Sequence, residues 1–167
     1  MIEVIDNFLP DNVSEDILNI MTNGNGEFRW AYQPYVNSDE SEEEHFQFVH
    51  FFYDRDIPQS QWFPQIYDTF APRLQIRALK RCKSNLIPRS DKNHLHGWHI
   101  DGSDRFAKGQ KTGIYYVNTT NGKTLFKNGK EIECVKNRMV IFPSELEHSS
   151  TSCTDEKVRI VINFNWY

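Results

Sequence analysis

The sequence predicts an α+β fold in which N-terminal helices support a jelly-roll core. Two segments of the first half carry apolar residues at helical spacing, whereas from Leu74 onward short strand-like runs alternate with Gly, Asn, Pro and Asp. The 167 residues contain no internal repeat and no low-complexity linker, and this length is typical of one compact domain. We therefore expect a single domain over residues 1–167.

Two helices are expected before the strand-rich part of the chain. In residues 11–23 the apolar side chains are spaced for one helix face, with polar capping candidates in front of them. In residues 65–71 two apolar side chains are four positions apart, and Pro64 and Pro72 bound the segment. We expect this second segment to be an outer helix.

The predicted strands are short and separated by turn residues. They cover residues 76–87, 98–101, 113–118, 123–126, 131–135, 139–142 and 158–166. An acidic segment, residues 37–44, is expected to be a solvated loop, with a substrate lid as the alternative.

Composition excludes several classes of protein. With 38% hydrophobic residues, 12 Phe, 7 Tyr and 4 Trp, the chain has enough apolar material to fold. No apolar run approaches the roughly 20 residues of a membrane helix, and residues 1–7 lack the basic region of a secretory signal. We therefore expect a cytoplasmic protein with no membrane partner. Three cysteines without a C-x-x-C pair argue against a disulfide framework, and a net charge of −4 disfavours a general attraction to nucleic acid.

One constellation of residues points to metal chemistry. His99 and Asp101 are two positions apart, so in a strand both side chains project from the same face and can bind one ion. His148 follows the apolar run 139–142 and could supply a third ligand. Two histidines and a carboxylate occupy one face of an octahedral ion and leave the opposite face open, as in non-haem Fe(II) oxygenases.

A cation and a phenol extend this pattern. Arg159 follows His148 by eleven residues, in a run that alternates like a half-buried strand. Its planar fork can hold a carboxylate through two parallel hydrogen bonds, which suits the distal carboxylate of 2-oxoglutarate. Tyr115 could donate its hydroxyl to the same carboxylate.

These residues resemble the 2-oxoglutarate- and Fe(II)-dependent dioxygenases, especially their prolyl-4-hydroxylase-like branch. The resemblance covers residues 74–167 and the opening segment 5–10. It implies a double-stranded β-helix, a jelly roll of the cupin-like type, with Fe(II) on three ligands and 2-oxoglutarate on two further side chains. The implied metal ligands are His99, Asp101 and His148. The implied cosubstrate residues are Arg159 and Tyr115.

The chain also departs from the pattern of that family. Many members carry a Tyr about ten residues before the first ligand histidine, where this chain has no Tyr, and Asn85 is our candidate substitute. Nucleic-acid dealkylating members carry a second Arg six residues after the first, whereas this chain has Asn165. This difference argues against a demethylase.

The resemblance also implies a reaction. Fe(II), 2-oxoglutarate and O2, with ascorbate as a further candidate, would hydroxylate a C–H bond and release succinate and CO2. A prolyl or other peptide residue is the favoured substrate. A free amino acid, a small metabolite or a nucleobase stays open, because no motif in the N-terminal half indicates the acceptor.

Two rival interpretations concern histidines outside the triad and a basic segment. His94 and His96 are also two apart and could bind metal, although we favour a loop role because no acidic partner follows them at strand spacing. A non-catalytic cupin-like module would use both of them together with His148.

The basic cluster lies in residues 73–92. There Arg77, Arg81 and Lys83 would share one strand face, which could meet an acidic substrate or the phosphates of a nucleic acid bound by an adaptor. A charged edge strand that resists aggregation is the plainer interpretation.

Overall fold

The computed structural model describes residues 1–23, 26–36, 45–101 and 108–167. In chain order its elements are β1 (Glu3–Ile5), α1 (Asp11–Thr22), β2 (Ala31–Gln33), β3 (Gln47–Asp54), β4 (Ile57–Pro58), α2 (Phe63–Leu74), β5 (Leu79–Pro88), β6 (Lys111–Tyr116), β7 (Lys123–Phe126), β8 (Glu131–Glu133), β9 (Arg138–Pro143), β10 (His148–Ser150) and β11 (Val158–Trp166). The acidic segment 37–44 lies outside the described residues, so its predicted loop is not tested.

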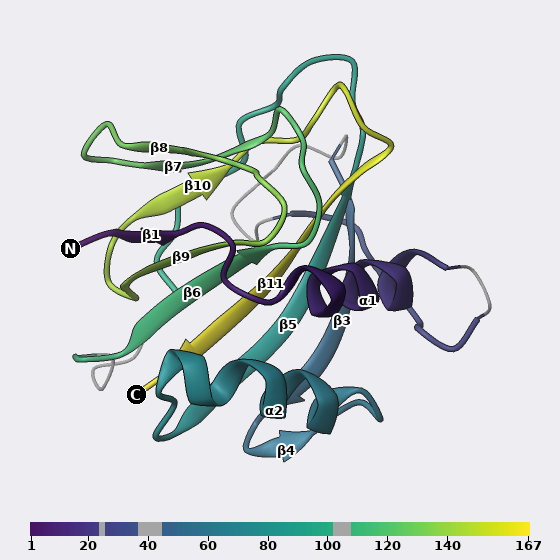
Figure 1. The fold of residues 1–167 in the computed structure, drawn as a ribbon. Helices are drawn as coiled ribbons and strands as arrows, with labels where there is room; N and C mark the ends of the chain where they lie inside the picture. The colour runs from purple at the N-terminus through teal and green to yellow at the C-terminus, as the bar shows by residue number, and fades with distance from the viewer. Residues whose placement is uncertain (24–25, 37–44, 102–107) are drawn as a thin grey trace.

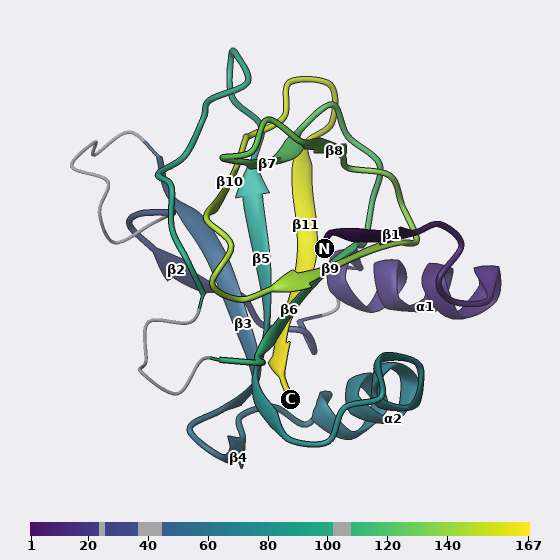
Figure 2. The same ribbon diagram turned by 90° about the vertical axis from the view of Figure 1, so that its left-hand side faces the viewer.

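Two antiparallel sheets form the body of the molecule. The larger sheet has the strand order β1-β9-β6-β11-β5-β3-β2, with β4 paired to β3, and the smaller sheet has the order β10-β7-β8. Figure 1 shows the smaller sheet on one side of the larger sheet and both helices on the other. The long strands β5 and β11 lie side by side in the middle of the larger sheet (Figure 2).

Alternation along β11 divides its side chains between two cores. The even-numbered residues pack beneath the helices: Ile160, Ile162, Phe164 and Trp166. Val161 instead packs between the two sheets, with residues such as Phe126 and Phe142. Because successive strand residues point to opposite faces, the odd-numbered residues from Arg159 to Asn165 face the space between the sheets.

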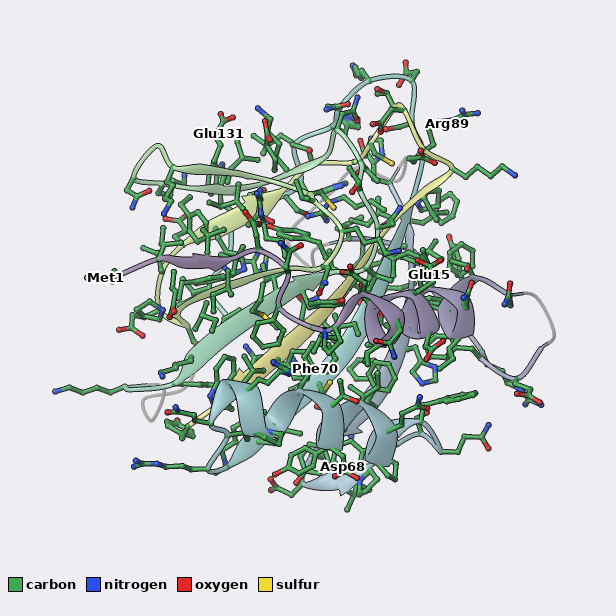
Figure 3. All side chains as sticks on the ribbon, in the orientation of Figure 1. Met1, Glu15, Asp68, Phe70, Arg89 and Glu131 are labelled. Atoms are coloured by element: carbon green, nitrogen blue, oxygen red, sulfur yellow. The ribbon has the colours of Figure 1, made fainter. Side chains whose placement is uncertain are left out.

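Both helices bury an apolar stripe on the larger sheet. Phe70 of α2, labelled in Figure 3, is fully buried. Its ring centroid lies 4.8 Å from that of Phe164. Ile17 and Met21 of α1 belong to the same cluster. Within the described ranges, no helix combines the length and the apolar character needed to span a bilayer.

Helix α2 is longer than its prolines suggest. Pro64 stands at its start, where a missing N–H leaves no hydrogen bond unmade. Pro72 lies inside the last turn, and the helix continues to Leu74, so the bounds predicted from the two prolines are too narrow. Gln75 then adopts a left-handed conformation (φ 54°) and its N–H bonds to the carbonyl of Ala71, which ends the helix.

The strands confirm part of the prediction and correct the rest. β7 and β11 have the predicted bounds. β1 to β4 and β10 were not expected. The prediction of an edge strand at residues 76–87 is wrong, because β5 lies between β3 and β11 in the interior of the larger sheet.

Candidate metal centre

The three predicted metal ligands meet at one point. His99, Asp101 and His148 each offer a ligand atom within 4.8 Å of the others, and no second group of this kind occurs in the described part of the chain. His99 Nε2 lies 3.9 Å from Asp101 Oδ1, and the two imidazole ring centroids are 4.4 Å apart. The donor set and its spacing fit one metal ion.

The backbone holds these residues without the strand that we expected. Residues 98–101, all within the described ranges, form no regular strand; His99 makes an isolated bridge to His148. The N–H of each of these two histidines donates to the carbonyl of the other at 2.9 Å, and the N–H of Asp101 donates to the carbonyl of Ser144 at 3.1 Å. Backbone hydrogen bonds between residues 99–101 and residues 144–148 therefore position all three predicted ligands.

The histidine tautomers suit metal binding. Nδ1 of His148 lies 3.0 Å from the carbonyl of Leu146, and Nδ1 of His99 lies 3.3 Å from the carbonyl of Gly97. A carbonyl oxygen only accepts, so each Nδ1 carries the hydrogen and each Nε2 keeps its lone pair. Burial lowers the pKa of His148 and outweighs the attraction of Asp101, which acts in the opposite direction. The neutral form of the ring is therefore favoured.

Three side chains hold the carboxylate of Asp101. Thr112 Oγ1 and Asn165 Nδ2 donate to Oδ2 at 2.9 and 3.1 Å, and Arg81 Nη2 donates to Oδ1 at 3.4 Å. Burial by itself would raise the pKa of this carboxyl, but in the acidic range where it titrates His148 is protonated, and the charges of His148 and Arg81 with the hydrogen bond from Asn165 keep the pKa lowered. Asp101 is therefore ionised and oriented before any metal binds.

The triad lines one end of a pocket between the two sheets. The pocket encloses about 580 Å³, part of it open to solvent, and its wall includes Arg81, Lys83 and Asn85 of β5 and Arg159 and Asn163 of β11. These residues come from the faces of β5 and β11 that look away from the helices.

Arg159 is buried in this wall, with an exposed fraction of 2%. Its Nη2 donates to Thr124 Oγ1 at 3.3 Å, and its guanidinium lies 5.7 Å from the ring centroid of Tyr116. Its Nε has no hydrogen-bond partner among the described residues. A buried guanidinium with an unused donor can bind an anion, so the residue is suited to the carboxylate ligand that the sequence predicts.

Tyr115 does not reach this pocket. Its hydroxyl lies beneath α1, where it donates to Ser14 Oγ at 3.0 Å and lies 3.2 Å from Asn137 Oδ1. The residue on the pocket side is Tyr116, whose hydroxyl donates to Thr124 Oγ1 at 2.8 Å. Adjacent strand residues point to opposite faces, so the position of Tyr115 does not fit the role that was predicted for it.

Asn85 lines the pocket, but side chains already occupy its amide group. Its Nδ2 donates to Gln47 Oε1, and its Oδ1 accepts from Asn163 Nδ2 at 2.8 Å. The role of Asn85 toward the cosubstrate stays a prediction.

His94 and His96 lie apart from the triad and pack with a third histidine. The ring centroid of His45 is 3.6 Å from that of His94 and 6.0 Å from that of His96. A backbone hydrogen bond from His96 N–H to the carbonyl of Ser150, at 2.9 Å, fixes this segment against β10. The structure therefore brings His148 to His99, and not to the histidine pair that a cupin-like module would use.

Sequence reasoning missed several residues of the site. Thr112 and Asn165 hold Asp101, and Thr124 links Arg159 to Tyr116. The period of two along residues 158–166 would have placed Asn165 on the face of Arg159. Nothing in the sequence marks the two threonines.

Comparison with known proteins places this geometry in context. No protein-family model matches the chain, and no curated protein has significant sequence similarity to it. Among solved structures, a prolyl-4-hydroxylase of Pseudomonas putida has a TM-score of 0.68 at 15% identity, covering 99% of this chain and 91% of the other. A prolyl hydroxylase of Trichoplax adhaerens, in complex with a hypoxia inducible factor peptide, has a TM-score of 0.69 at 13% identity over 99% and 83%.

The chain has the fold of the 2-oxoglutarate/Fe(II) oxygenases. A collagen prolyl hydroxylase of Paramecium Bursaria Chlorella virus-1, solved with 2-oxoglutarate, is another neighbour, with a TM-score of 0.62 at 15% identity over 99% of this chain and 93% of that one. The jelly-roll prediction is thereby confirmed. At such low identity the likeness to these oxygenases establishes the fold, and the chemistry must be argued from the side chains.

Proposed function

We propose that residues 1–167 form one 2-oxoglutarate- and Fe(II)-dependent dioxygenase domain that hydroxylates a C–H bond. The observation that carries the proposal is one pocket that holds both a two-histidine, one-carboxylate donor set and a buried arginine with an unused donor. The first group fits Fe(II), and the second fits the distal carboxylate of 2-oxoglutarate.

Each residue has a definite part in this mechanism. His99 and His148 would bind the metal through Nε2, and Asp101 through its carboxylate, so the protein occupies three coordination positions. When bound, Fe(II) and 2-oxoglutarate would supply the oxidative chemistry, in which O2 and 2-oxoglutarate are consumed, succinate and CO2 are released, and a C–H bond of the substrate is hydroxylated. Arg159 would fix the far end of the cosubstrate, and the hydrogen bonds to Asp101 would hold the metal ligand in place.

A prolyl or other peptide residue is the proposed substrate. Prolyl hydroxylases are prominent among the structural neighbours, and one of them was solved in complex with a hypoxia inducible factor peptide fragment. The triad is accessible to such a ligand on the side of His99, whose side chain is 36% exposed.

The first experiment tests the metal and cosubstrate site without a known substrate. Fe(II)-loaded protein, titrated with 2-oxoglutarate under anaerobic conditions, should develop a visible metal-to-ligand charge-transfer band. Asp101→Ala should abolish the band, Arg159→Ala should raise the 2-oxoglutarate concentration needed to produce it, and Lys80→Met, at an exposed position near the start of β5, should behave as wild type. A protein that binds no 2-oxoglutarate and makes no succinate in air would overturn the proposal.

A second experiment addresses the substrate. Lysate peptides incubated with the Fe(II)-loaded enzyme and 2-oxoglutarate should gain one oxygen atom on prolyl residues, as detected by mass spectrometry. Asp101→Ala protein is the matched control. Succinate formation without any modified peptide would argue for a small-molecule substrate instead.

A further inference from the structure

Lys83 is the cation in the pocket that the proposed mechanism does not use. It is partly buried on β5 between Arg81 and Asn85 and lines the pocket together with the triad and Arg159. Its ammonium makes no hydrogen bond or ion pair with any described residue. Burial lowers the pKa of Lys83 to about 8, with Arg81 acting in the same direction and Asp101 and Asp54 opposing it.

Strand register places Lys83 between the metal ligands and Arg159. On β5 and β11 the pocket-facing pairs are, in order, Arg81 with Asn165, Lys83 with Asn163, Asn85 with Val161, and Ile87 with Arg159. The first pair holds Asp101. Consecutive pairs on one face are separated by about 7 Å along the strand. Along the two strands, Lys83 therefore lies between the residues that hold Asp101 and the position of Arg159, nearer to the metal site.

The charges in the pocket leave this ammonium without a close anion. Asp101 is engaged by Arg81, Thr112 and Asn165. A partly desolvated cation is costly unless an anion accompanies it. 2-Oxoglutarate is a dianion with carboxylates at its two ends, and Arg159 accounts for one of them.

We propose that Lys83 binds the carboxylate at the keto-acid end of 2-oxoglutarate, so that the two ends of the dianion meet two different cations of the larger sheet. This inference rests on the proposed function. A substrate anion is the less favoured partner, because the open side of the triad is at His99, whereas Lys83 stands on an interior strand of the sheet floor.

The test separates the two ends of the cosubstrate by ligand choice. 2-Oxobutyrate keeps the keto-acid end and lacks the distal carboxylate. Its affinity and that of 2-oxoglutarate for Mn(II)-loaded protein are measured by isothermal titration calorimetry, with Mn(II) as a redox-stable substitute for Fe(II). The variants are Lys83→Met, Lys83→Arg, Arg159→Met and, as a control at an exposed position near the start of the same strand, Lys80→Met.

We expect Lys83→Met to weaken both keto acids by a similar factor of about ten or more, the size of a hydrogen bond to a charged group. Arg159→Met should weaken 2-oxoglutarate alone, Lys83→Arg should retain most of the affinity, and Lys80→Met should change neither ligand. Lys83→Met should also melt no lower than wild type, because no protein contact is lost.

Two results would overturn the inference, and they are distinguishable. If wild type and Lys83→Met bind both keto acids equally well, Lys83 does not contact the cosubstrate and is left to a substrate anion, while the proposed function stands. If metal-loaded wild type binds neither keto acid, the proposed function fails and the inference with it.

Discussion

At the scale of single residues, the direction of a side chain decides its role. Tyr115 and Tyr116 are neighbours in β6, yet one hydroxyl lies under α1 and the other lies beside Arg159. Asn163 and Asn165 instead share the pocket face of β11 and differ in position along it, so that Asn163 donates to Asn85 and Asn165 donates to Asp101. Spacing in the sequence could not choose between such neighbours without the register of the strand.

The tyrosine pair gives a matched prediction. Tyr116→Phe removes the hydroxyl that donates to Thr124, which also receives Arg159 Nη2, so 2-oxoglutarate affinity should fall by about threefold to tenfold. Tyr115→Phe should leave that affinity unchanged and lower the free energy of unfolding by about 1 kcal/mol, because it removes buried hydrogen bonds in the helix-side core. Calorimetric titration and urea denaturation of both variants check the pair; the reverse pattern would restore Tyr115 to the site.

At the scale of elements, the turn before β7 leaves room for the buried side chain of Arg159. Gly122 precedes β7, and a Cβ added there would lie 2.7 Å from Arg159 Cδ and 2.9 Å from the carbonyl oxygen of Ser152. The absence of a side chain at this position is therefore a condition for the buried arginine. β5 and β11 supply the opposite wall, because residues 81–87 of β5 and residues 159–165 of β11 alternate between the helix-side core and the pocket.

Two glycine substitutions separate this packing from general stability. Gly122→Ala should displace Arg159 and reduce 2-oxoglutarate affinity at least severalfold. Gly113→Ala places a Cβ 2.9 Å from Trp166 on the other face of the larger sheet, so it should lower the free energy of unfolding by about 1–3 kcal/mol and leave the affinity unchanged. Titration of the Mn(II)-loaded variants with 2-oxoglutarate, beside their urea denaturation curves, checks both. Equal affinity loss in the two variants would contradict the assignment.

At the scale of the whole molecule, folding buries histidines in a neutral form. The pKa of His50, His96 and His148 is lowered chiefly by burial, and that of His96 reaches about 3, with Arg159, His45 and His94 adding to the effect. Below pH 6.5 an unfolded chain takes up protons on these rings that the folded chain refuses.

The stability of the metal-free protein should therefore depend on pH in a definite direction. The free energy of unfolding should be highest above pH 6.5 and should fall as the pH decreases from 7 to 5, by up to about 1.4 kcal/mol per pH unit for each such group. Urea denaturation at several pH values checks this, and His96→Gln should reduce the slope. A stability that is constant over this range would show that the histidines titrate equally in both states.

The sequence by itself predicted the three candidate metal ligands that the structure brings together, Arg159 in the same pocket, and the bounds of β7 and β11. These carry local signals: fixed spacings, and side chains that alternate without interruption. It did not predict β3, where a register shift between Phe51 and Tyr53 breaks the alternation, or β1, β2, β4 and β10, which are three residues or shorter.

Only the tertiary structure decided which side chains share the pocket. The predicted strand at residues 98–101 does not form. An isolated bridge between His99 and His148 and the hydrogen bond from Asp101 N–H to the carbonyl of Ser144 hold these residues instead. Burial of β5 between two strands turned Arg81 and Lys83 from presumed surface charges into parts of the site. The physical reason is that spacing along a chain specifies periodicity, whereas the face that becomes buried depends on which strands pair with it.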